Sequence, residues 1–283
     1  MTAAPAPEPR PASTVLLLRD SRTPAGEIEV FMERRHLQSG FVGGAYVFPG
    51  GRVDPEDAID PSRCTDLDEP VASRRLGLTI GGLAHYVAAI RECFEEAGVL
   101  LAYDRSGSLL DFGDHAVEAH FKRARDLLNA GKLTIQELAD QDDLRLATDR
   151  IVYWSHWITP VGEPRRYDTR FFVTHAPDGQ TAVHDGWELT HSAWVAPKDA
   201  IERALKREWM IIFPTLMTLR ALAQHESAEA AVAWAAVQPM PRPVNQPKVF
   251  QGRVVLPGDP GYDEAEADLT GVDRDTFERL FYP

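Results

Sequence analysis

Three glutamates stand within five residues in the segment AAIRECFEEAG, which covers residues 88–98. On a helix that turns about 100° per residue, Glu92, Glu95 and Glu96 fall within an arc of roughly 100°. Clustered carboxylates are the ligands that hard divalent cations take in proteins. The segment therefore suggests a metal site, and the alternative is an acidic helix face in contact with solvent.

The position of these carboxylates within the helix is unfavourable. Like charges three or four residues apart repel at a cost of roughly 0.2–0.5 kcal/mol per pair. Gly98 is the expected C-terminal stop, so Glu95 and Glu96 lie in the last turn, where the helix dipole disfavours each anion by ~0.3–1 kcal/mol. Because local rules are broken mostly at functional sites, this arrangement favours a bound cation.

The opposite side of the same segment is apolar. Val87, Ile90 and Phe94 recur at helical spacing, and they predict a helix over residues 83–97 that buries this side in the core. The helix would thus carry carboxylates on one side and pack against the protein with the other.

The segments before this helix supply the other candidate elements. Strands are predicted over residues 14–18 and 27–35. The loop SGFVGGAYVFPGG follows, with five glycines in thirteen residues, and it is either a mobile connector or part of a phosphate-facing site. Residues 54–80 are polar and rich in proline, and they predict a long surface excursion.

The rest of the chain mixes predicted strands and helices, which indicates a layered α/β domain. The segment 113–141 is helical by pattern, with Asp114 as its N-cap and Gly131 as the stop of its first helix. Further strands are predicted over 98–103, 151–159, 168–176, 190–196 and within 248–256, and further helices over 197–206, 213–236 and 273–281.

Composition limits the classes of function. A net charge of −13 is atypical of nucleic-acid binding, which depends on contacts to phosphate. A phosphorylated small molecule would need a local cation, either a metal ion or an arginine cluster. The two cysteines lie outside any C-x-x-C motif, and no apolar run reaches the ~20 residues of a membrane span. We therefore expect a cytoplasmic protein with a small-molecule partner and without nucleic acid or membrane.

Two segments together resemble the Nudix box of the Nudix hydrolases: FPGGRVDPED, residues 48–57, and RECFEEAGV, residues 91–99. The family pattern is G-x5-E-x7-R-E-U-x-E-E-x-G-U, where U is a bulky apolar residue. The second half is matched fully, and the first half is matched by Gly51, with Asp57 where glutamate is usual. The spacing from Asp57 to Arg91 is 33 residues instead of seven, so the box holds an insertion of 26.

The interrupted box resembles that of one branch, typified by the mammalian peroxisomal coenzyme A diphosphatase. The segment SHWITPVGEPRRYDTRFFV, residues 155–173, is similar to that branch as well, and the resemblance spans about residues 14–225. It implies a Nudix fold, an α/β/α sandwich with a mixed central sheet. The expected organisation is a disordered tail (1–13), a Nudix domain (14–236) with a box insertion (58–83) and a helical insertion (111–150), and a C-terminal extension (237–283).

The resemblance implies hydrolysis of a pyrophosphate bond in a nucleoside diphosphate linked to another group, assisted by Mg²⁺ or Mn²⁺. Coenzyme A or acyl-CoA would give 3′,5′-ADP and 4′-phosphopantetheine. NADH, ADP-ribose or a dinucleoside polyphosphate are alternative substrates, and a non-catalytic nucleotide sensor is a third reading. The intact glutamates favour an enzyme over a sensor, and a homodimer is expected by analogy.

The resemblance also implies roles for particular residues. Glu92, Glu95 and Glu96 would be catalytic and would bind the metal, with the Gly50 carbonyl as a further ligand and Arg91 holding the glutamates in place. Substrate contacts are expected from Arg34, Arg52, Arg165, Arg166 and Asp57, with Arg35 and Arg170 as further candidates. The candidates for a catalytic base outside the box are His184, Asp185 and Glu188.

Overall fold

The computed structural model describes residues 7–21, 27–37, 42–183, 189–265, 268–269, 272 and 274–281. A mixed sheet forms its centre, in the order β10-β7-β8-β1-β2-β3, and β4 also pairs with β1 while β9 pairs with β2. β8 is parallel to β1, whereas β2 and β4 are antiparallel to it. The strands are β1 (Arg10–Asp20), β2 (Ile28–Arg35), β3 (Tyr46–Val47), β4 (Gly50–Arg52), β7 (Val152–Ile158), β8 (Tyr167–His175), β9 (Leu189–Val195) and β10 (Val244–Asn245).

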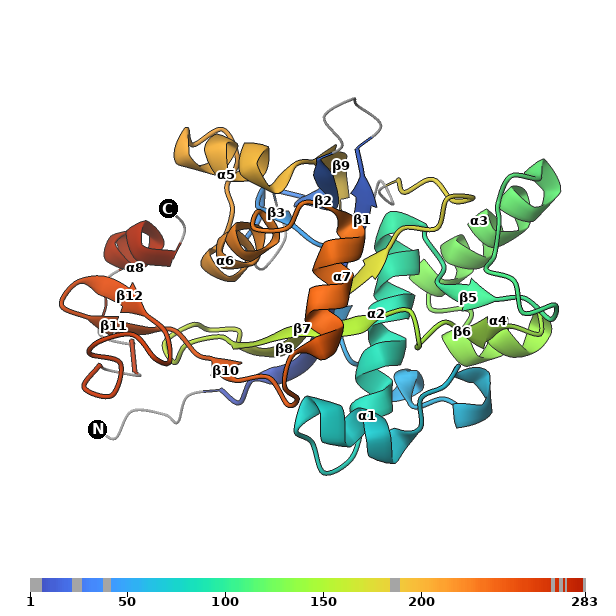
Figure 1. Cartoon of the computed structure of the whole chain (residues 1–283), viewed down its shortest axis with the longest axis horizontal. Helices are drawn as coiled ribbons and strands as arrows, with labels where there is room; N and C mark the ends of the chain where they lie inside the picture. The colour runs from blue at the N-terminus through green and yellow to red at the C-terminus, as the bar shows by residue number, and fades with distance from the viewer. Residues whose placement is uncertain are drawn as a thin grey trace.

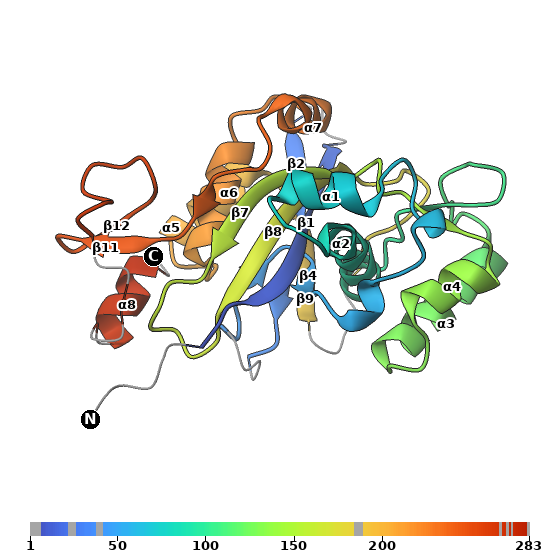
Figure 2. The ribbon, with the colours of Figure 1, turned by 90° about the horizontal axis from the view of Figure 1, so that it is seen from below.

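The sheet has helices on both faces. α1 (Glu69–Leu76) and α2 (Gly82–Ala97) cover one face, and α5 (Pro197–Leu205), α6 (Phe213–Leu222) and α7 (Ala228–Val237) cover the other (Figures 1 and 2). The run Val15–Leu18 of β1 is completely buried because both faces of this strand are covered. The expected α/β/α sandwich with a mixed central sheet is therefore confirmed.

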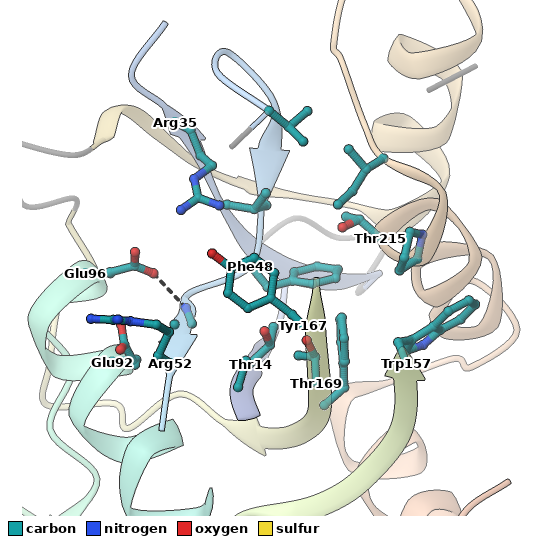
Figure 3. A pocket seen from close by; sticks show the side chains of 18 of the residues that line it. Thr14, Arg35, Phe48, Arg52, Glu92, Glu96, Trp157, Tyr167, Thr169 and Thr215 are labelled. Atoms are coloured by element: carbon teal, nitrogen blue, oxygen red, sulfur yellow. Dashed lines mark hydrogen bonds between the residues drawn. The ribbon is translucent and has the colours of Figure 1, made fainter. Parts of the chain in front are cut away.

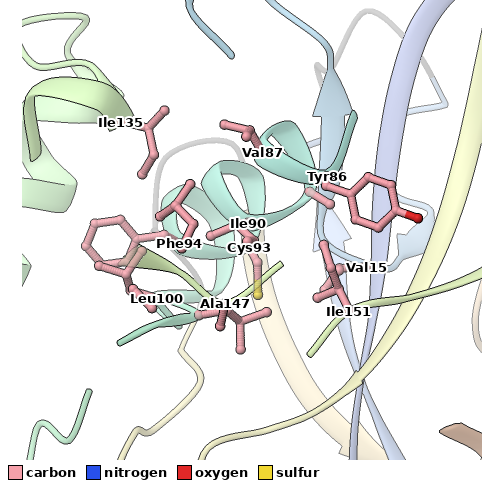
Figure 4. Packing of buried hydrophobic residues seen from close by; sticks show 14 of the residues in the cluster. Val15, Tyr86, Val87, Ile90, Cys93, Phe94, Leu100, Ile135, Ala147 and Ile151 are labelled. Atoms are coloured by element: carbon pink, nitrogen blue, oxygen red, sulfur yellow. The ribbon is translucent and has the colours of Figure 1, made fainter. Parts of the chain in front are cut away.

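α2 is the helix that the apolar spacing predicted. Val87 and Ile90 are completely buried between the sheet and the neighbouring helices, as Figure 4 shows. The helix ends at Gly98, whose φ of 71° is a left-handed conformation that glycine adopts without strain. The glutamates therefore do lie in the last turn and a half of the helix.

Residues 54–80 are not the surface excursion that their polarity predicted. They form two short 3₁₀ turns (Pro55–Asp57 and Pro61–Arg63) and α1, and α1 packs against α2. Ile59, Cys64 and Leu67 are buried in the core on the α2 side of the sheet. The prediction was wrong because these apolar residues are few and irregularly spaced.

The segment predicted to be a helical insertion, residues 111–150, contains the helices that were predicted. α3 (His115–Asn129) is capped by Asp114, whose carboxylate accepts hydrogen bonds from the first turn, and Gly131 follows its end with a φ of 64°. α4 (Ile135–Gln141) comes next. A short ladder between β5 (Ala102–Tyr103) and β6 (Arg145–Leu146) joins the two ends of the insertion.

The C-terminal part differs from prediction in two places. Residues 213–236 form two helices, α6 and α7, because Ser227 caps a new helix by accepting a hydrogen bond from Ala230 N–H. The single strand predicted within 248–256 is a hairpin of β11 (Lys248–Phe250) and β12 (Arg253–Val255), and α8 (Arg274–Phe281) follows it as predicted. Of the helices in the described residues, none is both long and apolar enough to span a bilayer.

Candidate active site

Arg91 is the centre of the acidic cluster. Its Nε and Nη2 donate to the two oxygens of Asp57, at 2.7 and 3.0 Å. Its Nη1 donates to Glu92 Oε1 at 2.9 Å and to Glu95 Oε2 at 2.7 Å. Nη2 also donates to the carbonyl of Arg52 at 2.9 Å. All five N–H groups of the guanidinium are thus used, which fixes the position of two of the three glutamates.

The pairing of Asp57 with Arg91 shows that the interrupted box is assembled. Asp57 is completely buried, and its shorter side chain still reaches Arg91 across the inserted segment. Burial raises the pKa of Asp57, and the hydrogen bonds from Arg91 oppose that rise. Asp57 was expected to contact substrate, but it lies beneath Arg91, and its side chain is not part of the cavity wall.

The FPGG turn brings the backbone against the other carboxylates. Gly50 N–H donates to Glu96 Oε2 at 2.7 Å (Figure 3). A Cβ at Gly51 would lie 2.4 Å from Glu92 Oε1, so a larger residue there would displace that carboxylate. β4 holds this turn in place, because Gly50 pairs with Thr14 of the central strand β1. The structure thus brings Gly50, Glu92 and Glu96 together.

The carboxylates are largely buried, unlike those of a solvated acidic face: the side chains of Glu92 and Glu95 are 12% and 16% exposed, and Glu96 is buried. Burial is the largest cause that raises the pKa of Glu92 and the pKa of Glu96. The next cause for Glu96 is the charge of Glu33, a completely buried carboxylate on β2. A cation placed among these groups would oppose both effects, so the site is built for positive charge.

The donor chemistry fits a divalent cation. Buried carboxylate and backbone carbonyl oxygens are the ligands that Mg²⁺ and Mn²⁺ prefer. Within the part of the chain that the structure describes, no three carboxylate, imidazole or thiol groups are already arranged around one point as a metal would require. Arg91 instead takes one oxygen of Glu92 and one of Glu95, and Gly50 takes one of Glu96.

Arg125 is a positioning residue that the sequence analysis missed. It lies on α3, and its Nε donates to the Glu95 carbonyl at 2.9 Å while its Nη2 donates to the Glu96 carbonyl. Asn129, one turn later, donates to the Glu95 carbonyl at 3.3 Å. The guanidinium of Arg125 thus lies at the negative end of the α2 dipole, and its charge offsets the unfavourable position of the glutamates.

Replacing Arg125 with alanine is expected to destabilise the protein by about 1.5–3 kcal/mol, because charged hydrogen bonds to the end of α2 are lost. Urea unfolding measures this change. The matched control is Arg123→Ala, an exposed arginine on the same helix, which is expected to stay within about 0.5 kcal/mol of wild type. Equal stability of the two variants would contradict the assigned role.

A large cavity begins at the carboxylates. Its volume is about 1310 Å³, above the ~300–1,000 Å³ usual for sites of small ligands. Arg35 and Arg52 line it beside Glu92 and Glu96 (Figure 3). Lys122 of α3 lines it as well, and the sequence analysis had not singled it out. Besides Arg91, whose N–H groups are all in use, three cationic side chains therefore line the cavity, and Arg35 and Arg52 lie close to the acidic cluster.

The other predicted arginines lie elsewhere. Arg34 is on β2 next to Tyr46 and is not among the cavity-lining residues. Arg165 and Arg166 line a separate, much smaller cavity, and Arg166 donates to the carbonyls of Thr159 and Pro7. Arg170 is buried and paired with Asp168 at 2.7 Å. The structure thus brings Arg35 and Arg52 to the acidic cluster, whereas these four lie outside the lining of the large cavity.

The candidate bases His184, Asp185 and Glu188 lie outside the described residues. Their assignment stays a prediction.

Comparison with known proteins agrees with the resemblance to the Nudix hydrolases. Residues 72–222 match the family model described as the NUDT19 Nudix domain. The chain is 29% identical over 332 residues to the acyl-coenzyme A diphosphatase NUDT19 of Gallus gallus, an alignment that covers 94% of this chain and 83% of that protein. It is 26% identical over 261 residues to the Homo sapiens protein of the same name, covering 80% of this chain and 65% of that one.

Among solved structures, the crystal structure of a NUDIX hydrolase from Alicyclobacillus acidocaldarius is similar to most of this chain. It superposes with a TM-score of 0.63 at 27% sequence identity. The match covers 82% of this chain and 99% of that one.

Proposed function

Because this chain belongs to the Nudix hydrolases and carries a Nudix domain of the NUDT19 type, we propose that it is a metal-dependent diphosphatase of coenzyme A or acyl-CoA. The family predicted from the interrupted box is confirmed, and so is the Nudix fold. In the proposed reaction, water attacks one phosphorus of the diphosphate, and the products are 3′,5′-ADP and 4′-phosphopantetheine or its acylated form.

One observation carries the proposal: Glu92 and Glu96 are held against the Gly50–Gly51 turn at the start of a cavity of about 1310 Å³. Glu92, Glu95, Glu96 and the Gly50 carbonyl would hold Mg²⁺ or Mn²⁺. When bound, such an ion neutralises phosphate charge and makes its water more acidic. Acidic side chains alone would repel a diphosphate, so this cluster is useful to an enzyme that works with a cation.

Side chains of the protein orient the glutamates and supply positive charge for the diphosphate. Arg91 holds an oxygen of Glu92 and one of Glu95, which leaves the second oxygen of each for other partners. Arg35, Arg52 and Lys122 line the cavity where a diphosphate beside these carboxylates would lie, and they would bind its oxygens. Coenzyme A carries a further 3′-phosphate, so several cations near one end suit it.

Cleavage of a panel of nucleotide compounds tests the proposed substrate. The purified protein is incubated with Mg²⁺ and, separately, with CoA, dodecanoyl-CoA, NADH, ADP-ribose and diadenosine tetraphosphate, and the products are resolved by chromatography. We expect kcat/KM for CoA or dodecanoyl-CoA to exceed that of the other compounds at least about tenfold, a difference of about 1.4 kcal/mol in transition-state binding. Preferred cleavage of another compound would refute the proposed substrate.

Removal of the metal is the second part of the same experiment. A chelator is expected to abolish cleavage, and an excess of Mg²⁺ or Mn²⁺ is expected to restore it. Cleavage at an unchanged rate in the chelator would exclude the proposed role of a cation, and binding without cleavage under every metal condition would indicate a nucleotide sensor.

A further inference from the structure

The large cavity is chemically divided along its length. Glu92, Glu96, Arg35 and Arg52 lie together at one end, and Trp157 lies at the other (Figure 3). β1 and β8 form the part between them, through Thr14, Tyr167 and Thr169. A ligand that fills the whole cavity must therefore be charged at one end and apolar at the other.

Aromatic rings from three distant segments build the apolar end. Trp157 of β7 meets Phe213 of α6 edge to face, with ring centroids 6.2 Å apart. Phe213 meets Phe281 of α8 in the same way at 6.0 Å. All three rings line the cavity, together with Ile212, Pro214 and Pro247. Surfaces of this kind bind hydrocarbon through the loss of apolar area from water.

Part of this apolar end lies outside the family model. The match to the family model ends at residue 222, whereas Pro247 and Phe281 belong to the C-terminal segment. Phe281 is held there by a small core of its own, in which it packs with Leu269, Val249 and Val254. The C-terminal segment is therefore positioned to decide what the apolar end accepts.

Charge decides which part of the substrate lies at each end. The 3′-phosphate and the diphosphate of coenzyme A belong to its nucleotide part, so that part suits Arg35, Arg52 and Lys122. The acylated pantetheine arm carries no charge beyond the diphosphate and suits the apolar end.

We propose that the aromatic end of the cavity, closed by Phe281 of the C-terminal segment, binds the acyl-thioester end of the substrate. This inference rests on the proposed function, and it adds a subsite that sets the preference for acyl chains. We expect these contacts to bind the acyl chain equally in the ground state and in the transition state, so that their loss raises KM and leaves kcat nearly unchanged.

The test compares CoA with dodecanoyl-CoA in the full-length protein. Phe281→Ala is expected to lower kcat/KM for dodecanoyl-CoA about tenfold, mainly through KM, and to leave that for CoA within about twofold. The control is Arg279→Ala on the same helix, an exposed residue that is absent from the cavity lining and is expected to keep the ratio of the two substrates. Phe281→Leu, which keeps an apolar side chain, is expected to show a smaller loss.

Two results would overturn the inference while leaving the proposed function intact. The first is an unchanged ratio in Phe281→Ala, which would show that the acyl chain lies elsewhere. The second is an equal loss with CoA, dodecanoyl-CoA and NADH, which would place the adenine shared by all three at the aromatic end. Absence of CoA cleavage by the wild type would instead refute the proposed function.

Discussion

Glu96→Gln is expected to lower kcat by about 10²–10³, the range found when one group that stabilises charge in a transition state is removed. The amide keeps an oxygen that can accept the hydrogen bond from Gly50 N–H, so the turn is expected to stay in place. What is lost is the negative charge that a cation requires. The measurement is kcat on the preferred substrate of the panel, with exposed Glu56→Gln as the control that keeps wild-type activity.

In the absence of metal, Glu96→Gln is expected to raise the stability of the fold, although it lowers activity. The pKa of Glu96 in the folded protein lies well above the ordinary value of 4.5, through burial and the charge of Glu33. Stability from this group is therefore complete below pH 4.5 and is lost as the pH rises through the folded pKa. At pH 8 in a chelator, Glu96→Gln should melt at a higher temperature than wild type.

Adding Mn²⁺ should then reverse the order. Wild type gains stability by binding the ion, and the variant gains less because a ligand charge is missing. Thermal melting with chelator and with Mn²⁺ measures both differences without relying on catalysis. An Mn²⁺-induced rise in melting temperature that is equal in the two proteins would show that Glu96 does not take part in holding the cation.

Arg91→Met is expected to destabilise the fold by about 3–5 kcal/mol at neutral pH, the cost of leaving a buried charge without its partner. Asp57 is completely buried and loses both hydrogen bonds, and Glu92 and Glu95 lose the cation between them. Urea unfolding is the measurement. Arg105→Met, at an exposed position, is the control and should stay within about 0.5 kcal/mol of wild type.

A second substitution separates charge from shape in this prediction. If the unpaired Asp57 carboxylate causes the loss, then Asp57→Asn in the Arg91→Met background should recover part of the stability. Additive losses in the double variant would argue that Arg91 acts through packing instead. In either background activity should be low, since the glutamates lose the group that orients them.

The helix with the carboxylates could be predicted because its signals are local. Val87, Ile90 and Phe94 give its period, and Gly98 gives its end. The assembly of the box could be expected from the family pattern, but the hydrogen bonds between Asp57 and Arg91 could not, because they depend on where the inserted residues return. The role of Arg125 could not be predicted from the sequence, because an arginine on a helix carries no sequence pattern that indicates which distant carbonyl groups it binds.

Two errors have simpler causes. Alternation along β8 could have placed Arg170, because Tyr167, Thr169 and Phe171 face the cavity and Arg170 therefore faces the opposite side of the sheet. Its charge alone indicated a phosphate contact, whereas the strand period decides which side of the sheet it faces. After Pro214 at the start of α6, residues 215–236 contain neither glycine nor proline, so the break between α6 and α7 had no strong marker except the N-cap Ser227.

Arg125 also couples two parts of the chain that lie apart in sequence. The residue comes from the helical insertion, yet it serves the glutamates of the box through the carbonyls of Glu95 and Glu96. A homologue that lost this insertion would need to recruit a different cation at that place or accept a weaker helix end. We therefore expect the insertion and the form of the box to be inherited together, so that descendants keep both or replace both.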